Sequence, residues 1–122
     1  MYNKVDLQMH ELSLCENIIN SVDDAVTKNN INKNNPIKVN ILLGTLAGVD
    51  KSSLSFWFPV IAEKMGYHAL VLEIMDQVAV GKCVSCDMEY SMESLVDPCS
   101  ECGSFDRNIL SGMAFNIKSL EV

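Results

Sequence analysis

The chain has 122 residues, 48% of them hydrophobic, and a formal net charge of −7 at pH 7. This length allows one ordinary hydrophobic core plus a small module, and the composition is that of a globular protein. The negative charge repels phosphate backbones and so counts against nucleic-acid binding, and no apolar run approaches the roughly eighteen residues of a membrane span.

The first predicted element is an amphipathic helix. Ser13 to Glu16 has the S-x-x-E form of a capping box, and apolar residues recur at helical spacing after it. We expect the helix to begin there, or a few residues earlier near His10, and to end in the asparagine-rich stretch 28–36. Its apolar positions are Leu14, Ile18, Ile19, Val22 and Val26.

A strand and a second helix follow. Residues 37–43 alternate between apolar and other side chains, which predicts a half-buried strand that closes at Gly44. Asp50 is expected to cap a helix with one apolar stripe, ending at Gly66. Pro59 falls inside this helix, and we expect a kink or a short break there because proline removes one backbone N–H.

The C-terminal half is expected to contain more strands. Residues 69–80 are aliphatic without a clean period, which indicates a strand buried on much of both faces. Residues 88–92 fit one arm of a small hairpin, and residues 111–122 alternate as a final strand. We expect the final strand to lie beside the strand 69–80, so that the segment between them is an insertion between neighbouring strands.

That segment carries two C-x-x-C pairs. A two-residue spacer lets both sulfurs of a pair face one ion at about 2.3 Å, and two pairs complete a tetrahedron. Four thiolates leave no position open, so we interpret the pairs as a structural zinc site. Gly103 lets the chain turn tightly and aim backbone N–H groups at the sulfurs. The ligands are Cys83, Cys86, Cys99 and Cys102.

Other interpretations use the same cysteines. Disulfides are typical of exported proteins, and residues 1–8 contain no apolar run of an export signal, so we expect a soluble, cytoplasmic protein. Iron in a rubredoxin-like cage has the same ligands and stays open, although zinc is the default for this ligand set. The predicted fold class is α+β: a small β-sheet with two helices in residues 1–80 plus 108–122, and an inserted four-cysteine zinc-ribbon module in residues 81–107.

His10 and Glu11 form a second candidate metal site. The H-E-x-x-H pattern of zinc metalloproteases fails because its fifth position is Leu14. Met9, His10 and Glu11 instead place an imidazole, a carboxylate and backbone nitrogens within one turn, which we expect to precede the first helix. Such donors suit Ni(II) or Cu(II), although a His-Glu pair at a helix start is more often only a polar pair near exposed N–H groups.

Three stretches together resemble the HypA/HybF family of nickel-iron hydrogenase maturation factors. They are residues 9–16, residues 41–49, and the paired cysteines with residues 98–104, and the resemblance runs from Met9 to Val122. It implies an α+β nickel metallochaperone that is not an enzyme. Nickel would be bound by the imidazole and backbone nitrogen of His10, with Glu11 as a ligand or beside one, and the four cysteines would hold zinc.

The resemblance also implies partners: a HypB-like GTPase and the precursor of the hydrogenase large subunit. In that family Met-His-Glu is N-terminal, so the amine of its Met can help bind nickel, whereas eight residues precede Met9 here. We predict that a chain starting at Met9 binds Ni(II) more tightly than the full chain does. The alternative function is a structural zinc-ribbon adaptor that binds proteins without mobile metal, and a third is an iron-sulfur-type electron carrier.

Other candidate ligands are expected to be structural. We expect His68 to be solvated after the Gly66 turn, and Cys15 to be buried as a small hydrophobe. The methionines fit core positions better than a soft-metal site, and we place Met65, Met75 and Met113 in the core.

Overall fold

The computed structural model describes residues 4–122, with side chains from His10 onward. This part of the chain contains two helices and six strands, which confirms the predicted α+β class. None of its helices is both long and apolar enough to cross a membrane. The elements are α1 (Lys4–Lys28), β1 (Ile37–Gly44), α2 (Lys51–Lys64), β2 (Leu70–Gln77), β3 (Ala79–Cys83), β4 (Glu89–Met92), β5 (Arg107–Ser111) and β6 (Phe115–Glu121).

The chain forms two compact units. Among the described residues, the first contains residues 4–41, 49–73 and 117–122, and the second contains residues 42–48 and 74–116. The second unit holds all four paired cysteines and includes the predicted module 81–107. The functional domain boundaries proposed from the sequence stay a prediction.

Helix α1 begins earlier than expected. It starts at Lys4, so the capping box proposed at Ser13 is wrong and Ser13 lies inside the helix. Residues 4–13 contain neither glycine nor proline, so nothing in them ends a helix. The predicted apolar stripe is confirmed at Ile18, Ile19, Val22 and Val26, which are all buried, whereas Leu14 is only partly buried.

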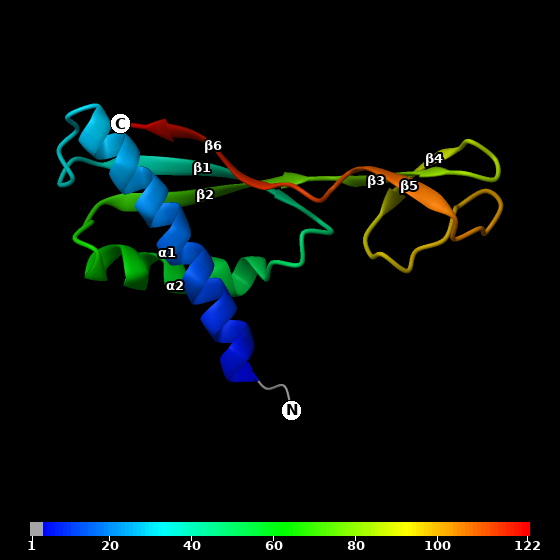
Figure 1. The fold of residues 1–122 in the computed structure, drawn as a ribbon, viewed down its shortest axis with the longest axis horizontal. Coiled ribbons are helices and arrows are strands. Elements are labelled where there is room, and N and C mark those ends of the chain that lie inside the picture. Colours follow the sequence, from blue (N-terminus) through cyan, green and yellow to red (C-terminus); the bar gives the residue numbers. More distant parts are fainter. Residues whose placement is uncertain (1–3) are drawn as a thin grey trace. The chain divides into compact units, whose positions relative to one another are not determined.

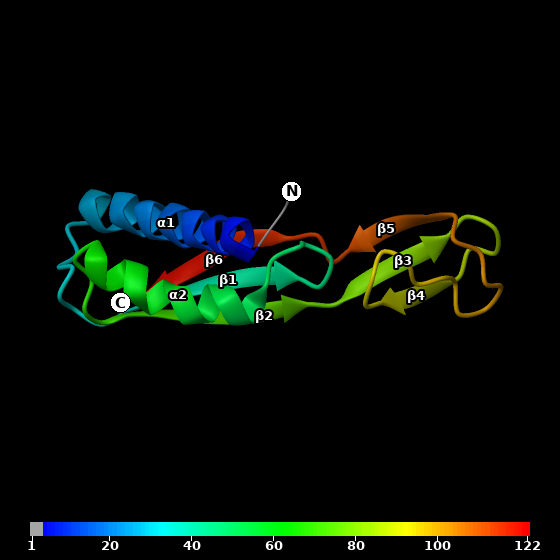
Figure 2. The ribbon, with the colours of Figure 1, turned by 90° about the horizontal axis from the view of Figure 1, so that it is seen from below.

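Helix α2 begins at the predicted cap. The carboxylate of Asp50 accepts a hydrogen bond from the backbone N–H of Ser53 at 3.2 Å. The expected break is absent: the helix runs through Pro59, because Ser55 and Pro59 are both exposed and the carbonyl that loses its donor can bond water. Both helices pack against each other on one side of the first sheet (Figures 1 and 2).

The first sheet has the strand order β2-β1-β6. The prediction that the final strand lies beside residues 69–80 is therefore wrong, because β1 lies between them. Asn40 of β1 donates hydrogen bonds to Ser119 Oγ at 3.0 Å and to Glu121 Oε2 at 2.7 Å, which joins β1 to β6. β1 ends at Gly44 as predicted, but it is buried at most positions and on both faces, so the prediction of a half-buried strand is wrong. The reason is its central place in the sheet, which covers both of its edges.

Residues 69–80 form two strands in two sheets, not one strand buried on both faces. β2 is an edge strand whose Val71, Glu73 and Met75 are exposed. Met113 is exposed as well, so the prediction that Met75 and Met113 fill the core is wrong, and Met65 is only partly buried. In the second unit it is Met92 that fills the core. Burial of Cys15 and exposure of His68 are confirmed.

The second sheet has the order β4-β3-β5, with β3 in the middle (Figure 2). β4 is the predicted hairpin arm and pairs antiparallel with β3, from Ala79 opposite Met92 to Lys82 opposite Glu89. β5 was not expected; it also pairs antiparallel with β3, with an irregularity at Val80.

Two glycines, Gly44 and Gly112, let two backbone segments of this unit approach each other closely. A Cβ on Gly44 would lie 2.1 Å from the carbonyl oxygen of Gly112, and Gly112 itself has φ +110°. The N–H of Leu46 donates to that same carbonyl at 2.7 Å. This close approach brings the buried Leu46 side chain into the core that supports the cysteines.

Candidate metal centre

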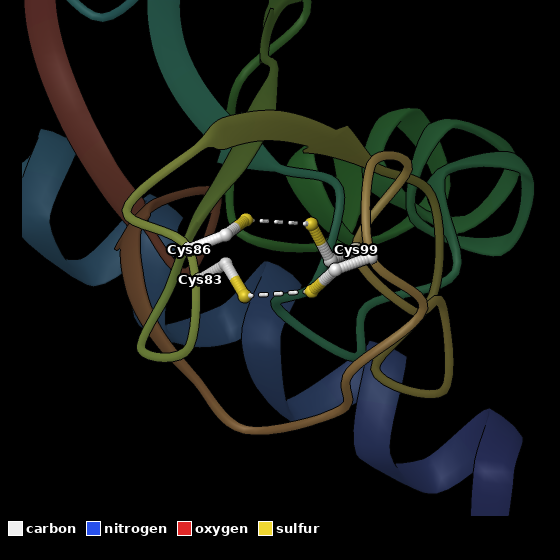
Figure 3. A group of neighbouring side chains, drawn as sticks. Cys83, Cys86 and Cys99 are labelled. Atoms are coloured by element: carbon white, nitrogen blue, oxygen red, sulfur yellow. Dashed lines mark hydrogen bonds between the residues drawn. The ribbon is translucent and has the colours of Figure 1, made fainter.

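The four paired cysteines converge on one point. Cys83 ends β3 and Cys86 lies in the turn before β4, whereas Cys99 and Cys102 lie in the loop before β5. Their sulfur atoms all lie within 4.8 Å of one another. The Sγ of Cys83 is 3.5 Å from that of Cys102, and the Sγ of Cys86 is 3.7 Å from that of Cys99. Figure 3 shows the labelled sulfurs pointing toward one another.

These separations fit one tetrahedral ion. Zinc–sulfur bonds of about 2.3 Å place the ligands of a tetrahedron roughly 3.8 Å apart, whereas a disulfide requires about 2.05 Å. All five cysteines are free thiols in the structure. The arrangement therefore fits a four-thiolate metal site and not a pair of disulfides.

The loop around the second pair favours the ionised form of one sulfur, that of Cys99. The backbone N–H of Glu101 donates to the Sγ of Cys99 at 3.4 Å, and Gly103 adopts φ +77° to complete the turn. The pKa of Cys99 falls to about 7, because backbone N–H groups of Cys102 and Glu101 donate to its sulfur against the opposing effect of burial. Metal ions bind the thiolate, so these donors prepare the ligand.

A small core supports the sulfurs from beneath. Cys83 and Cys99 are buried in it, whereas Cys86 and Cys102 are exposed. Half of the ligand set is thus anchored by packing and half faces outward. The members of this core are Leu46, Ala79, Cys83, Tyr90, Met92 and Cys99.

Two polar residues, Asp97 and Arg107, hold the loop between the pairs. The carboxylate of Asp97 accepts from the N–H groups of Glu93 at 2.8 Å and Ser94 at 3.2 Å. The guanidinium of Arg107 donates to the carbonyls of Phe105 and Leu95. Aspartate in a turn carries a usable signal, but nothing local in the sequence identifies the carbonyls that Arg107 reaches.

The structure does not bring His10 and Glu11 together. Both lie inside α1 instead of before it, so that expectation is wrong. His10 is exposed, whereas Glu11 is only 3% exposed and its Oε2 has no hydrogen-bond partner among the described residues. Within the described part of the chain, the paired cysteines are the one group of three or more potential ligands close enough to share an ion.

Comparison with known proteins covers nearly the whole chain. Residues 9–122 match the family model described as hydrogenase/urease nickel incorporation, metallochaperone, hypA. The hydrogenase maturation factor HypA of Francisella philomiragia is 40% identical over 92% of this chain and 97% of its own length. The factor of the same name from Psychromonas ingrahamii is 36% identical over 93% of this chain and 98% of its own.

Solved structures share the fold. The solution structure of the Ni metallochaperone HypA from Helicobacter pylori matches with a TM-score of 0.57 and 23% identity, over 91% of this chain and 95% of that one. A second solution structure of a HypA protein matches with a TM-score of 0.59 and 24% identity, over 93% and 95% of the two chains.

Proposed function

Because this chain belongs to the HypA family of nickel-incorporation metallochaperones, we propose that it carries Ni(II) to a nickel-iron hydrogenase while that enzyme matures. The family match over residues 9–122 is the observation that carries the proposal. The protein's task is transfer of an ion, so it acts as a carrier and not as an enzyme. We place it in the cytoplasm, where its recipient is assembled.

The four paired cysteines are proposed to hold zinc. The sulfur separations of 3.5 and 3.7 Å support this assignment, as does the donated N–H at Cys99. Zinc bound by four thiolates has no open position, so it stabilises the second unit and does not take part in transfer. A rubredoxin-like iron site has the same donor set, and elemental analysis of the purified protein separates the two metals.

Nickel is proposed to be the cargo, bound through His10. The exposed imidazole of His10 is the donor that solvent can reach, and nitrogen and oxygen donors suit Ni(II). The backbone nitrogen of His10 and the carboxylate of Glu11 complete the proposed ligand set. Release occurs by ligand exchange to a better-matched site, with a HypB-like GTPase and the hydrogenase large-subunit precursor as partners.

The test is delivery of the ion. The zinc-containing chain is loaded with Ni(II), freed of excess metal, and incubated with immobilised large-subunit precursor in the presence of a chelator. We expect the precursor to acquire nickel from the loaded chain and little from nickel buffered by the chelator alone. Equal acquisition from both sources contradicts the carrier function and favours a zinc-ribbon adaptor without mobile metal.

A further inference from the structure

The two proposed nickel ligands cannot meet while α1 is intact. Successive residues of an α-helix are about 100° apart around its axis, so neighbours do not face each other. The observed burial agrees: His10 is exposed and Glu11 is 3% exposed. One ion cannot contact both side chains in this conformation.

The backbone nitrogen of His10 is occupied as well. α1 begins at Lys4, six residues before His10. In an α-helix each N–H donates to the carbonyl four residues earlier, so the N–H of His10 is directed to the carbonyl of Asp6. Coordination through this nitrogen requires that hydrogen bond to break.

Glu11 makes the helical form of this segment less stable. Its side chain lies on the face of α1 that packs against α2, since Cys15, one turn later, is buried and its thiol donates to the carbonyl of Leu54 at 3.8 Å. A buried carboxylate oxygen without a hydrogen bond disfavours the conformation that buries it. Unwinding the segment lets Glu11 leave the helix interface.

We infer that nickel loading unwinds α1 from Lys4 to Glu11, about two turns. The buried Oε2 of Glu11, which has no hydrogen-bond partner among the described residues, favours this change. The inference rests on the proposed nickel site and adds its regulation. The helical conformation and the ion compete for the backbone nitrogen of His10 and the side chain of Glu11. The stability of the first two turns of α1 therefore sets the affinity for nickel.

The experiment uses the full, zinc-containing chain titrated with Ni(II) and followed by calorimetry and far-ultraviolet circular dichroism. The helices contain 25 and 14 residues, so loss of two turns should remove about a fifth of the helical signal. Glu11→Leu should raise the melting temperature of the nickel-free protein, because an apolar side chain replaces a buried carboxyl group with one unpartnered oxygen. It should also lower nickel affinity about tenfold or more.

A second variant tests the competition without touching a ligand. Gln8→Gly weakens the helix before His10 and should raise nickel affinity about threefold. His10→Ala serves as the matched control: it should abolish nickel binding and leave the melting temperature of the nickel-free protein unchanged, because His10 is exposed.

The outcomes separate the two proposals. Nickel binding with an unchanged helical signal, or a Glu11→Leu variant whose melting temperature does not rise, overturns the unwinding and leaves the carrier function standing. Absence of nickel binding by the full chain, or unchanged binding by His10→Ala, overturns the nickel site and the unwinding together.

Discussion

The sulfur atoms of Cys83 and Cys102 lie 3.5 Å apart, although the two residues are nineteen positions apart in the chain. They meet because β5 returns antiparallel to β3, which brings the loop before β5 back to the end of β3. Closing this loop costs conformational entropy, and the core beneath it is small. An ion bound by all four sulfurs would offset that cost.

Replacing one of these ligands should remove the metal and disorder the unit. We expect Cys83→Ser to lose zinc, because a buried ligand is replaced by a weaker donor, and to lose amide protection across β3, β4 and β5. Elemental analysis and hydrogen exchange measure the two effects. Cys15→Ala is the matched control, since this buried cysteine lies in the first unit, and it should keep one zinc per chain. Full zinc occupancy in Cys83→Ser contradicts the assignment.

Gly44 should tolerate no side chain. Its Cβ would lie 2.1 Å from the carbonyl oxygen of Gly112, which is backbone and cannot rotate away. We expect Gly44→Ala to lower the free energy of unfolding by about 3 kcal/mol, as overpacking does. Gly48→Ala is the comparison: its Cβ meets nothing within 4 Å, and φ +75° alone should cost about 1 kcal/mol. Equal denaturation midpoints for the two variants would show that the close approach is not rigid.

Cys15 should make stability fall in alkaline solution. Burial, with the nearby charges of Glu11 and Glu16, raises its pKa from 9.0 to about 11. Between these values the unfolded chain releases the proton and the folded chain keeps it, so stability falls as pH rises, by roughly 2 kcal/mol over the interval. Well below pH 9 both states keep the proton, and the effect vanishes.

The check compares denaturation of the wild-type chain and Cys15→Ala at several pH values. Other groups titrate in both proteins, so the difference in slope between pH 9 and 11 isolates Cys15. Parallel slopes would mean that the thiol ionises in the folded protein as easily as in the unfolded one.

Local signals in the sequence predicted both helices and the convergence of the four paired cysteines. The cap at Asp50, the apolar stripe of α1 and the spacing of the cysteine pairs depend on residues close together in the chain, and the structure confirms each. Strand neighbours were harder, because β6 lies beside β1 through contacts such as Asn40 with Glu121, which no local pattern encodes. The start of α1 was predicted too late, because residues 13–16 have the sequence form of a capping box and yet lie inside the helix.

The nickel ligands show a different limit. Sequence places His10 beside Glu11, and adjacency in sequence was taken as proximity in space. Helix geometry separates their side chains, leaving one exposed and the other buried. A motif of adjacent residues therefore predicts a site only for the backbone conformation that lets its side chains converge.

The most direct test of the central claim is a calorimetric Ni(II) titration of the zinc-containing chain, its His10→Ala variant and its His68→Ala variant, with zinc measured before and after. His68 is an exposed histidine of the same unit and controls for adventitious binding. We predict that nickel binding is lost in His10→Ala and kept in His68→Ala, with zinc retained in all three proteins. Undiminished nickel binding by His10→Ala, or nickel that displaces zinc from the cysteines, would contradict the claim that His10 binds nickel while the cysteines keep zinc.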